Sequence, residues 1–291
     1  MPAPEPASNE TAATEQGPKP IDRLIRRLQL EPSGPNDDGS LSFRGEGGQG
    51  AATEGDRLFG GLVLAQSIMA AGAVLTGRAI HVSQHSFLRS AQANVELDYR
   101  VRTTMSGRTF ASVIVEVVQR DVIVCHAQIS ATAPDVGPAH EDPMVRTSAP
   151  DDAVNRDKLR GRANWRDQPF DMRLLPEEFS GRDPSWTLWS RAVGDAIADP
   201  LTNVALLAYA SDRSMLSTAW KPHASTGELR GVTLNHTIWF HQPVEVHRWH
   251  QHALHSSWAA NGRGLIHGRF HRDDGLFVAS TAQEAVVRVR R

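Results

Sequence analysis

The sequence contains a single cysteine, Cys125, among its 291 residues. One cysteine excludes a disulfide within the chain, and so few cysteines are typical of a protein from a reducing compartment. The apolar neighbours of Cys125 in "VIVCHAQI" favour a small core residue over a reactive thiol. We therefore expect a chain that folds without disulfide bonds.

Long hydrophobic runs and a charge excess of one sign are also missing. The longest apolar run, "GGLVLAQSIMAAGAVL" at 60–75, is too short to span a membrane and contains Gln66 and Ser67. The formal net charge of -2 gives no electrostatic attraction toward nucleic acid or an anionic membrane. Residues 1–20 lack the basic and apolar regions of a secretory signal, and their Pro, Ala, Glu and Thr content predicts disorder. We expect a cytoplasmic protein with no membrane insertion and no nucleic-acid partner.

Several motifs of known chemistry are absent as well. There is no G-x-S-x-G motif of a serine hydrolase and no glycine-rich loop that would bind phosphate. The one histidine-rich stretch is "HRWHQHALH" at 247–255, where His250 and His252 would share a strand face but Leu254 follows them. We expect neither a metal site nor a cofactor.

The sequence does contain, twice, a long apolar helix followed by four candidate strands. An apolar helix at 60–75 precedes strand candidates at 80–89, 95–104, 109–119 and 122–131, of which "TFASVIVEVV" is rich in β-branched residues. A second helix at 204–220 precedes strand candidates at 231–242, 248–258, 263–272 and 275–288. "RDDG" at 272–275 is a strong hairpin turn. This order predicts an α+β protein of two similar units.

Sequence landmarks in the two units are separated by a constant 155 positions. His81 and His236, Gly107 and Gly262, and Gln128 and Gln283 all share that offset. We interpret this as a tandem duplication, with an N-terminal unit at 21–134 and a C-terminal unit at 184–291. Residues 135–183 are rich in proline and charge, which indicates a surface linker with one short helix at 152–160.

Six short motifs, spread over most of the chain, resemble those of a known protein family and occur in the same order. They are "SFRG" (42–45), "LFGGLVLAQSIMAA" (58–71), "HSFLR" (85–89), "YASD" (209–212), "HTIWFHQP" (236–243) and "GLFVASTAQEAV" (275–286). With them the chain resembles the acyl-CoA thioesterase II (TesB-like) family. The resemblance implies a double hotdog fold, in which each unit wraps an antiparallel sheet around a long central helix.

The resemblance also implies an activity and a site. The activity is hydrolysis of fatty acyl-CoA to free acid and CoA without a covalent intermediate, in a homo-oligomer that needs no cofactor. The family's catalytic acid, hydroxyl and amide fall on Asp212, Thr233 and Gln283. A carboxylate can take a proton from water, and a hydroxyl and an amide can hold that water in place. Taken singly, Asp212 could instead cap the backbone or pair with an arginine, and the other two could be ordinary strand residues.

Three departures from the family pattern leave alternatives open. Asn235 stands where the family often has Asp, Ser90-Ala91 replaces a common Pro-Gly, and Gln84 replaces a second histidine. A non-catalytic acyl-CoA-binding protein of the same fold is therefore one alternative. A hotdog enoyl-CoA hydratase is another, although its D-x-N-P-x-H segment is missing. His81 and His236 could act as bases, but their matched positions favour a structural role in the sheet.

Overall fold

The computed structural model describes residues 18–48 and 57–289. Most of the expected disordered tail (1–20) lies outside these residues, and helix α1 already begins at Pro20. The helices are α1 (Pro20–Leu28), α2 (Gly60–Val74), α3 (Arg156–Leu159), α4 (Pro176–Ser180) and α5 (Pro200–Trp220). Short 3-10 helices lie at η1 (Pro150–Asp152), η2 (Trp165–Asp167) and η3 (Lys221–His223). None of the described helices is long and apolar enough to cross a membrane.

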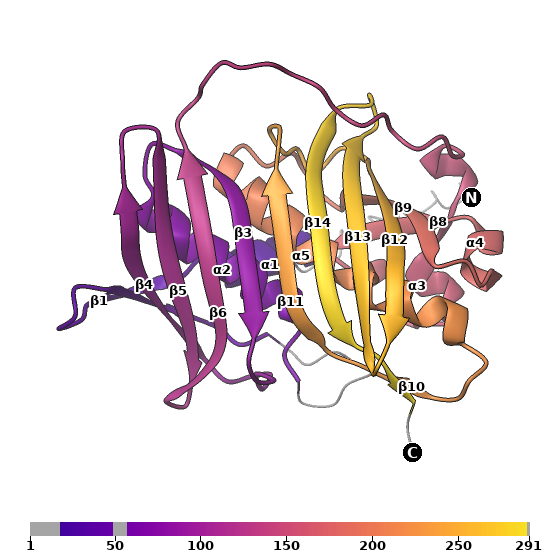
Figure 1. Cartoon of the computed structure of the whole chain (residues 1–291), viewed down its shortest axis with the longest axis horizontal. Helices are drawn as coiled ribbons and strands as arrows, with labels where there is room; N and C mark the ends of the chain where they lie inside the picture. The colour runs from indigo at the N-terminus through magenta and orange to yellow at the C-terminus, as the bar shows by residue number, and fades with distance from the viewer. Residues whose placement is uncertain (1–17, 49–56, 290–291) are drawn as a thin grey trace, which may run out of the picture.

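Thirteen of the strands form a single antiparallel sheet (Figure 1). In the N-terminal part they are β1 (Glu31–Pro35), β2 (Leu41–Gly45), β3 (Ala79–Phe87), β4 (Leu97–Ser106), β5 (Phe110–Gln119) and β6 (Val122–Thr132). The others are β7 (Val154–Asn155), β8 (Phe170–Leu174), β9 (Ser185–Ala192), β11 (Thr233–Phe240), β12 (His250–Ala260), β13 (Arg263–Arg272) and β14 (Phe277–Val286). A separate pair joins β10 (Leu229–Arg230) and β15 (Arg288–Val289).

The strand order repeats about the centre of the sheet. On one side it is β4-β5-β6-β3, and on the other it is β11-β14-β13-β12, with β3 and β11 joined antiparallel at the junction. The eight strands expected from the sequence are all present, with ends shifted by a few residues at most. The "RDDG" turn is present too, with Gly275 at φ +91°. The expected α+β fold of two similar units is confirmed, and the junction makes the two sheets continuous.

The two long helices lie together behind the sheet (Figure 1). Helix α2 is too apolar to have a polar face, and ten of its fifteen residues are buried. Helix α5 begins four residues before the expected start, because Asp199 caps it by accepting a hydrogen bond from the Thr202 amide (2.8 Å) and Pro200 occupies the first turn. Small buried side chains such as Ala205 and Ala208 let α5 pack closely on its neighbours.

The segment expected to be a linker, 135–183, is more structured than a simple connector. Its first part crosses one end of the sheet as an extended loop (Figure 1). Its second part adds β8 and β7 to the edge of the C-terminal unit through pairing with β9. The alternation in "FDMRL", with Phe170, Met172 and Leu174 buried, explains why this stretch forms a strand.

Candidate active site

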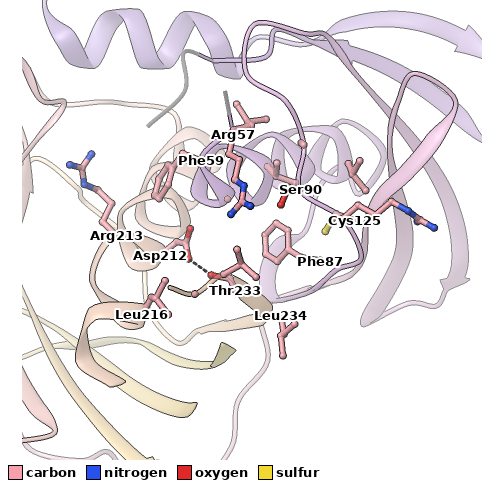
Figure 2. Close-up of a pocket in the computed structure, with 18 of the residues that line it drawn as sticks. Arg57, Phe59, Phe87, Ser90, Cys125, Asp212, Arg213, Leu216, Thr233 and Leu234 are labelled. Atoms are coloured by element: carbon pink, nitrogen blue, oxygen red, sulfur yellow. Dashed lines mark hydrogen bonds between the residues drawn. The ribbon is translucent and has the colours of Figure 1, made fainter. Parts of the chain in front are cut away.

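A pocket of about 650 Å³ opens between the two units (Figure 2). Its walls come from the start of α2, the end of β3 with the loop that follows, β6, the segment after α3, helix α5 and the start of β11. The lining side chains include Arg57, Phe59, Phe87, Ser90, Cys125, Asp212, Arg213, Leu216, Thr233 and Leu234. The pocket therefore combines an apolar surface with the carboxylate of Asp212.

Asp212 faces the pocket from the middle of α5, opposite the first residues of α2. A Cβ atom added at Gly60 would lie only 2.9 Å from Oδ2 of Asp212, so glycine is what allows the helix start to approach the carboxylate. The N-terminus of a helix carries partial positive charge, which favours a negative group there. The backbone N–H of Gly61 accordingly favours the ionised form of Asp212 and acts to lower its pKa.

Neighbouring strands bring Thr233 and Gln283 to the same carboxylate. Strand β11 pairs directly with β14, so the two side chains reach toward α5 together. The Thr233 hydroxyl donates to Oδ1 of Asp212 (3.3 Å), and Nε2 of Gln283 donates to Oγ1 of Thr233 (3.1 Å). The three residues expected to form the site are thus in one hydrogen-bonded chain.

A fourth residue, His236, extends this chain beyond what the sequence indicated. Its Nδ1 lies 2.7 Å from Oε1 of Gln283, and its Nε2 lies 2.9 Å from the Ser211 hydroxyl. Because Nε2 of Gln283 donates to Thr233, its Oε1 must accept from the Nδ1–H of His236. The hydrogen bonds therefore all run in one direction: His236 donates to Gln283, Gln283 donates to Thr233, and Thr233 donates to Asp212. The sequence signal was the first "H" of "HTIWFH", three positions after Thr233 on the same strand.

Burial shifts the pKa values of both ends of this chain. Desolvation raises the pKa of Asp212 above its ordinary value of 3.8, although the Thr233 hydroxyl, the Gly61 amide and Arg213 oppose that rise. Desolvation also lowers the pKa of His236 below 6.5. A carboxylate with a raised pKa is a stronger base than an ordinary one, and a neutral imidazole keeps its Nδ1–H for Gln283.

Comparisons with known proteins agree with this geometry. Residues 162–286 match the acyl-CoA thioesterase family, and residues 49–133 match the acyl-CoA thioesterase N-terminal domain. Acyl-CoA thioesterase 2 of Haemophilus influenzae is 31% identical over 287 residues, which cover 92% of this chain and 98% of that protein. The chain belongs to the acyl-CoA thioesterase family.

This thioesterase is also similar to an animal protein and to proteins of solved structure. Acyl-coenzyme A thioesterase 8 of Rattus norvegicus is 29% identical, with 80% of each chain covered. The crystal structure of acyl-CoA thioesterase II TesB2 from Mycobacterium marinum has a TM-score of 0.78 and 26% identity, covering 92% of this chain and 98% of that one. A protein described by its hot dog fold, from Alicyclobacillus acidocaldarius, has a TM-score of 0.75 at 15% identity, covering 92% and 99%. The double hotdog expectation is confirmed.

The N-terminal unit of the thioesterase does not repeat the arrangement of Gln283 and His236 at the duplicated positions. Gln128, at the 155-residue offset from Gln283, is exposed on the outer face of β6, whereas Gln283 is fully buried. Side chains alternate along a strand, so Gln128 is not the equivalent of Gln283, and the inward-facing residues beside it are Ala127 and Ile129. Likewise His81 sits half-buried at a β-bulge, while the partner that pairs across from His236 is His85.

Other residues singled out in the sequence have structural roles. Gln66 of α2 is fully buried and accepts a hydrogen bond from the Tyr99 hydroxyl (2.5 Å), while its Nε2 donates to the carbonyl of Arg27 (2.7 Å). Asn235 bonds to Glu284 across the strand pair and not to the Asp212 chain. Cys125 is buried beside the pocket, and desolvation raises the pKa of its thiol to about 12, so it is not a thiolate at neutral pH.

Proposed function

We propose that this thioesterase hydrolyses acyl-CoA with a water molecule activated by Asp212, Thr233 and Gln283. The observation that carries the proposal is the one-way chain of hydrogen bonds that ends on a carboxylate facing the pocket. A buried carboxylate costs free energy unless it is hydrogen-bonded, and here the protein supplies donors on one side while the pocket leaves the other open. That arrangement suits a general base.

The chemistry then needs one water and no covalent intermediate on the enzyme. Asp212 takes a proton from the water as its oxygen forms a bond to the thioester carbonyl carbon. Collapse of the tetrahedral intermediate breaks the carbon–sulfur bond, and the proton passes from Asp212 to the departing thiolate of CoA. The first-turn amides of α2 lie beside this carboxylate and provide positive potential for the developing negative charge.

A thiol-release assay with acyl-CoA of short, medium and long chains tests the proposal. Asp212→Asn keeps the size of the side chain but removes the base, and we expect kcat to fall by roughly 10²–10⁴-fold. Thr233→Val removes the hydroxyl that bonds to the carboxylate, whereas Thr233→Ser retains it and should retain most of the activity. An unchanged rate in Asp212→Asn would show that another group is the base.

A non-catalytic acyl-CoA-binding protein remains the competing function. Calorimetry with acyl-CoA distinguishes the two, because binding without any release of thiol by the wild-type protein would contradict hydrolysis. We favour hydrolysis because Asn235, which stands where the family often has Asp, bonds to Glu284 and leaves the Asp212 chain intact.

A further inference from the structure

The charged side chains that line the pocket are strongly unbalanced in sign. Among the described residues, five arginines and a single acid, Asp212, form its walls; the arginines are Arg57, Arg89, Arg160, Arg162 and Arg213. The whole chain, by contrast, has a formal net charge of only -2. Positive charge is therefore concentrated at this opening, where it raises the local concentration of anions.

Three of these arginines surround one buried acid and form what we call the linker arginine cluster: Arg160, Arg162 and Arg213. Asp157, at the start of α3, lies 3.2 Å from Arg213 and 3.5 Å from Arg162. The same carboxylate lies 3.4 Å from the buried Arg156. Three guanidinium groups thus share one carboxylate, and Arg160 has no ion pair with any of the residues that the structure describes.

The cluster is held rigidly against the helix that carries the proposed base. Arg156 is only 1% exposed, and it donates to the carbonyl oxygen of Arg213 (2.9 Å) and to the hydroxyl of Ser214 (2.5 Å). The side chain of Asn155 caps α3 by accepting from the amides of Asp157 (3.0 Å) and Lys158 (3.1 Å). The bonds of Arg156 fasten the linker to α5 directly after Asp212, and the cap orders the turn that carries Arg156.

So much uncompensated positive charge is unfavourable in the empty protein. Desolvation is the largest effect on Arg160 and lowers its pKa, and the neighbouring Arg162 and Arg213 lower it further. Like charges at short range repel one another, and that repulsion is relieved when an anion binds between them. An arrangement that is costly without a ligand and favourable with one indicates a binding site.

We propose that Arg160, Arg162 and Arg213 bind the phosphate groups of the CoA part of the substrate, so that the linker between the units completes the site. The inference rests on the proposed function, since CoA is the phosphate-bearing half of an acyl-CoA. Guanidinium groups match phosphate oxygens in paired hydrogen bonds, and they keep their charge at every physiological pH. The apolar side chains of Phe87, Val124 and Leu216 in the same pocket are left for the uncharged parts of the substrate.

Two thioesters of the same acid, one with and one without the phosphate-bearing part of CoA, test this assignment. The double variant Arg160→Gln/Arg162→Gln is compared with wild type on an acyl-CoA and on the N-acetylcysteamine thioester of the same acid, which has no phosphate. We expect the ratio of kcat/KM for the CoA ester to that for the small ester to fall at least about tenfold, as for a lost charge-assisted hydrogen bond. The control Arg100→Gln/Arg102→Gln makes the same charge change on exposed positions of β4 and should leave the ratio unchanged.

A binding measurement separates this proposal from the proposed function. Adenosine 3′,5′-bisphosphate, which carries phosphates of CoA but no thioester, should bind wild type with an affinity that falls at least tenfold in the double variant. An equal ratio and an equal affinity in wild type and double variant would overturn the phosphate site, even while wild type hydrolyses acyl-CoA. Hydrolysis of neither thioester by wild type would instead contradict the proposed function.

Discussion

Nδ1 of His236 lies 2.7 Å from Oε1 of Gln283, and this contact sets the direction of the whole hydrogen-bonded chain. With Oε1 occupied, the amide of Gln283 can present only its Nε2 to Thr233, 3.1 Å away. Thr233 then has its single proton free for Asp212. We infer that His236 is a positioning residue, which acts on the reaction only through Gln283.

Substitution of His236 by two residues tests that role. His236→Leu removes the donor, so we expect kcat to fall at least about tenfold with little change in KM, as for one lost hydrogen bond. His236→Asn places an amide N–H near the position of Nδ1 and should restore part of the loss. The Thr233 hydroxyl lowers the pKa of Asp212, and His236 orients that hydroxyl through Gln283, so the acid limb of the pH–rate profile should move to higher pH in the leucine variant. If His236→Leu and wild type had equal pH–rate profiles, His236 would be a residue of the core without a positioning role.

Gly60 is expected to be intolerant of even a methyl group. The Cβ atom of Gly60→Ala would lie 2.9 Å from Oδ2 of Asp212 and 3.3 Å from the ring of Phe87, so the carboxylate must move. A misplaced base lowers kcat, and we expect a loss of about 10²-fold in steady-state assays. Gly137→Ala is the matched control, because a Cβ atom there meets nothing within 4 Å. Full activity in Gly60→Ala would show that the close approach of α2 is not needed.

The raised pKa of Asp212 predicts opposite effects of pH on activity and on stability. The base must be ionised, so the rate should fall as pH decreases through a pKa that lies above 3.8. Burial favours the neutral form in the folded state, so the stability that this group contributes at low pH is lost as pH rises through its folded pKa. Asp212→Asn should therefore raise the melting temperature at neutral pH while it lowers kcat, and the gain in melting temperature should disappear below pH 3.8. A lower melting temperature at neutral pH would contradict this.

Asp157 should contribute to stability with the opposite pH dependence. Although burial acts to raise its pKa, Arg156, Arg213 and Arg162 together hold that pKa below 3.8. Its contribution is thus complete above the unfolded value and is lost as pH falls through the lower folded pKa. Asp157→Asn should lower the free energy of unfolding by about 3 kcal/mol at neutral pH in urea titrations, because buried arginines lose their counter-charge. The difference from wild type should shrink in acid, and a constant difference would refute the argument.

The sequence by itself determined the elements and their order. Apolar content and β-branched residues are local signals, and they correctly indicated α2, α5 and all eight central strands. Asp212 also stood out locally, because an acid on an alanine-lined helix needs a compensating partner. The start of α5 at Pro200 could have been found in the same way, from the "DP" dipeptide that caps it.

Tertiary structure alone decided which side chains meet. The matched offset of Gln128 and Gln283 said nothing about the face of the sheet, because a one-residue difference in register turns a strand residue from the interior to the outside. Strand pairing is what places His236 on Gln283, and the path of the linker is what brings Arg160 and Arg162 to the pocket. Contacts between segments distant in sequence depend on register and packing, which no local pattern of residues records.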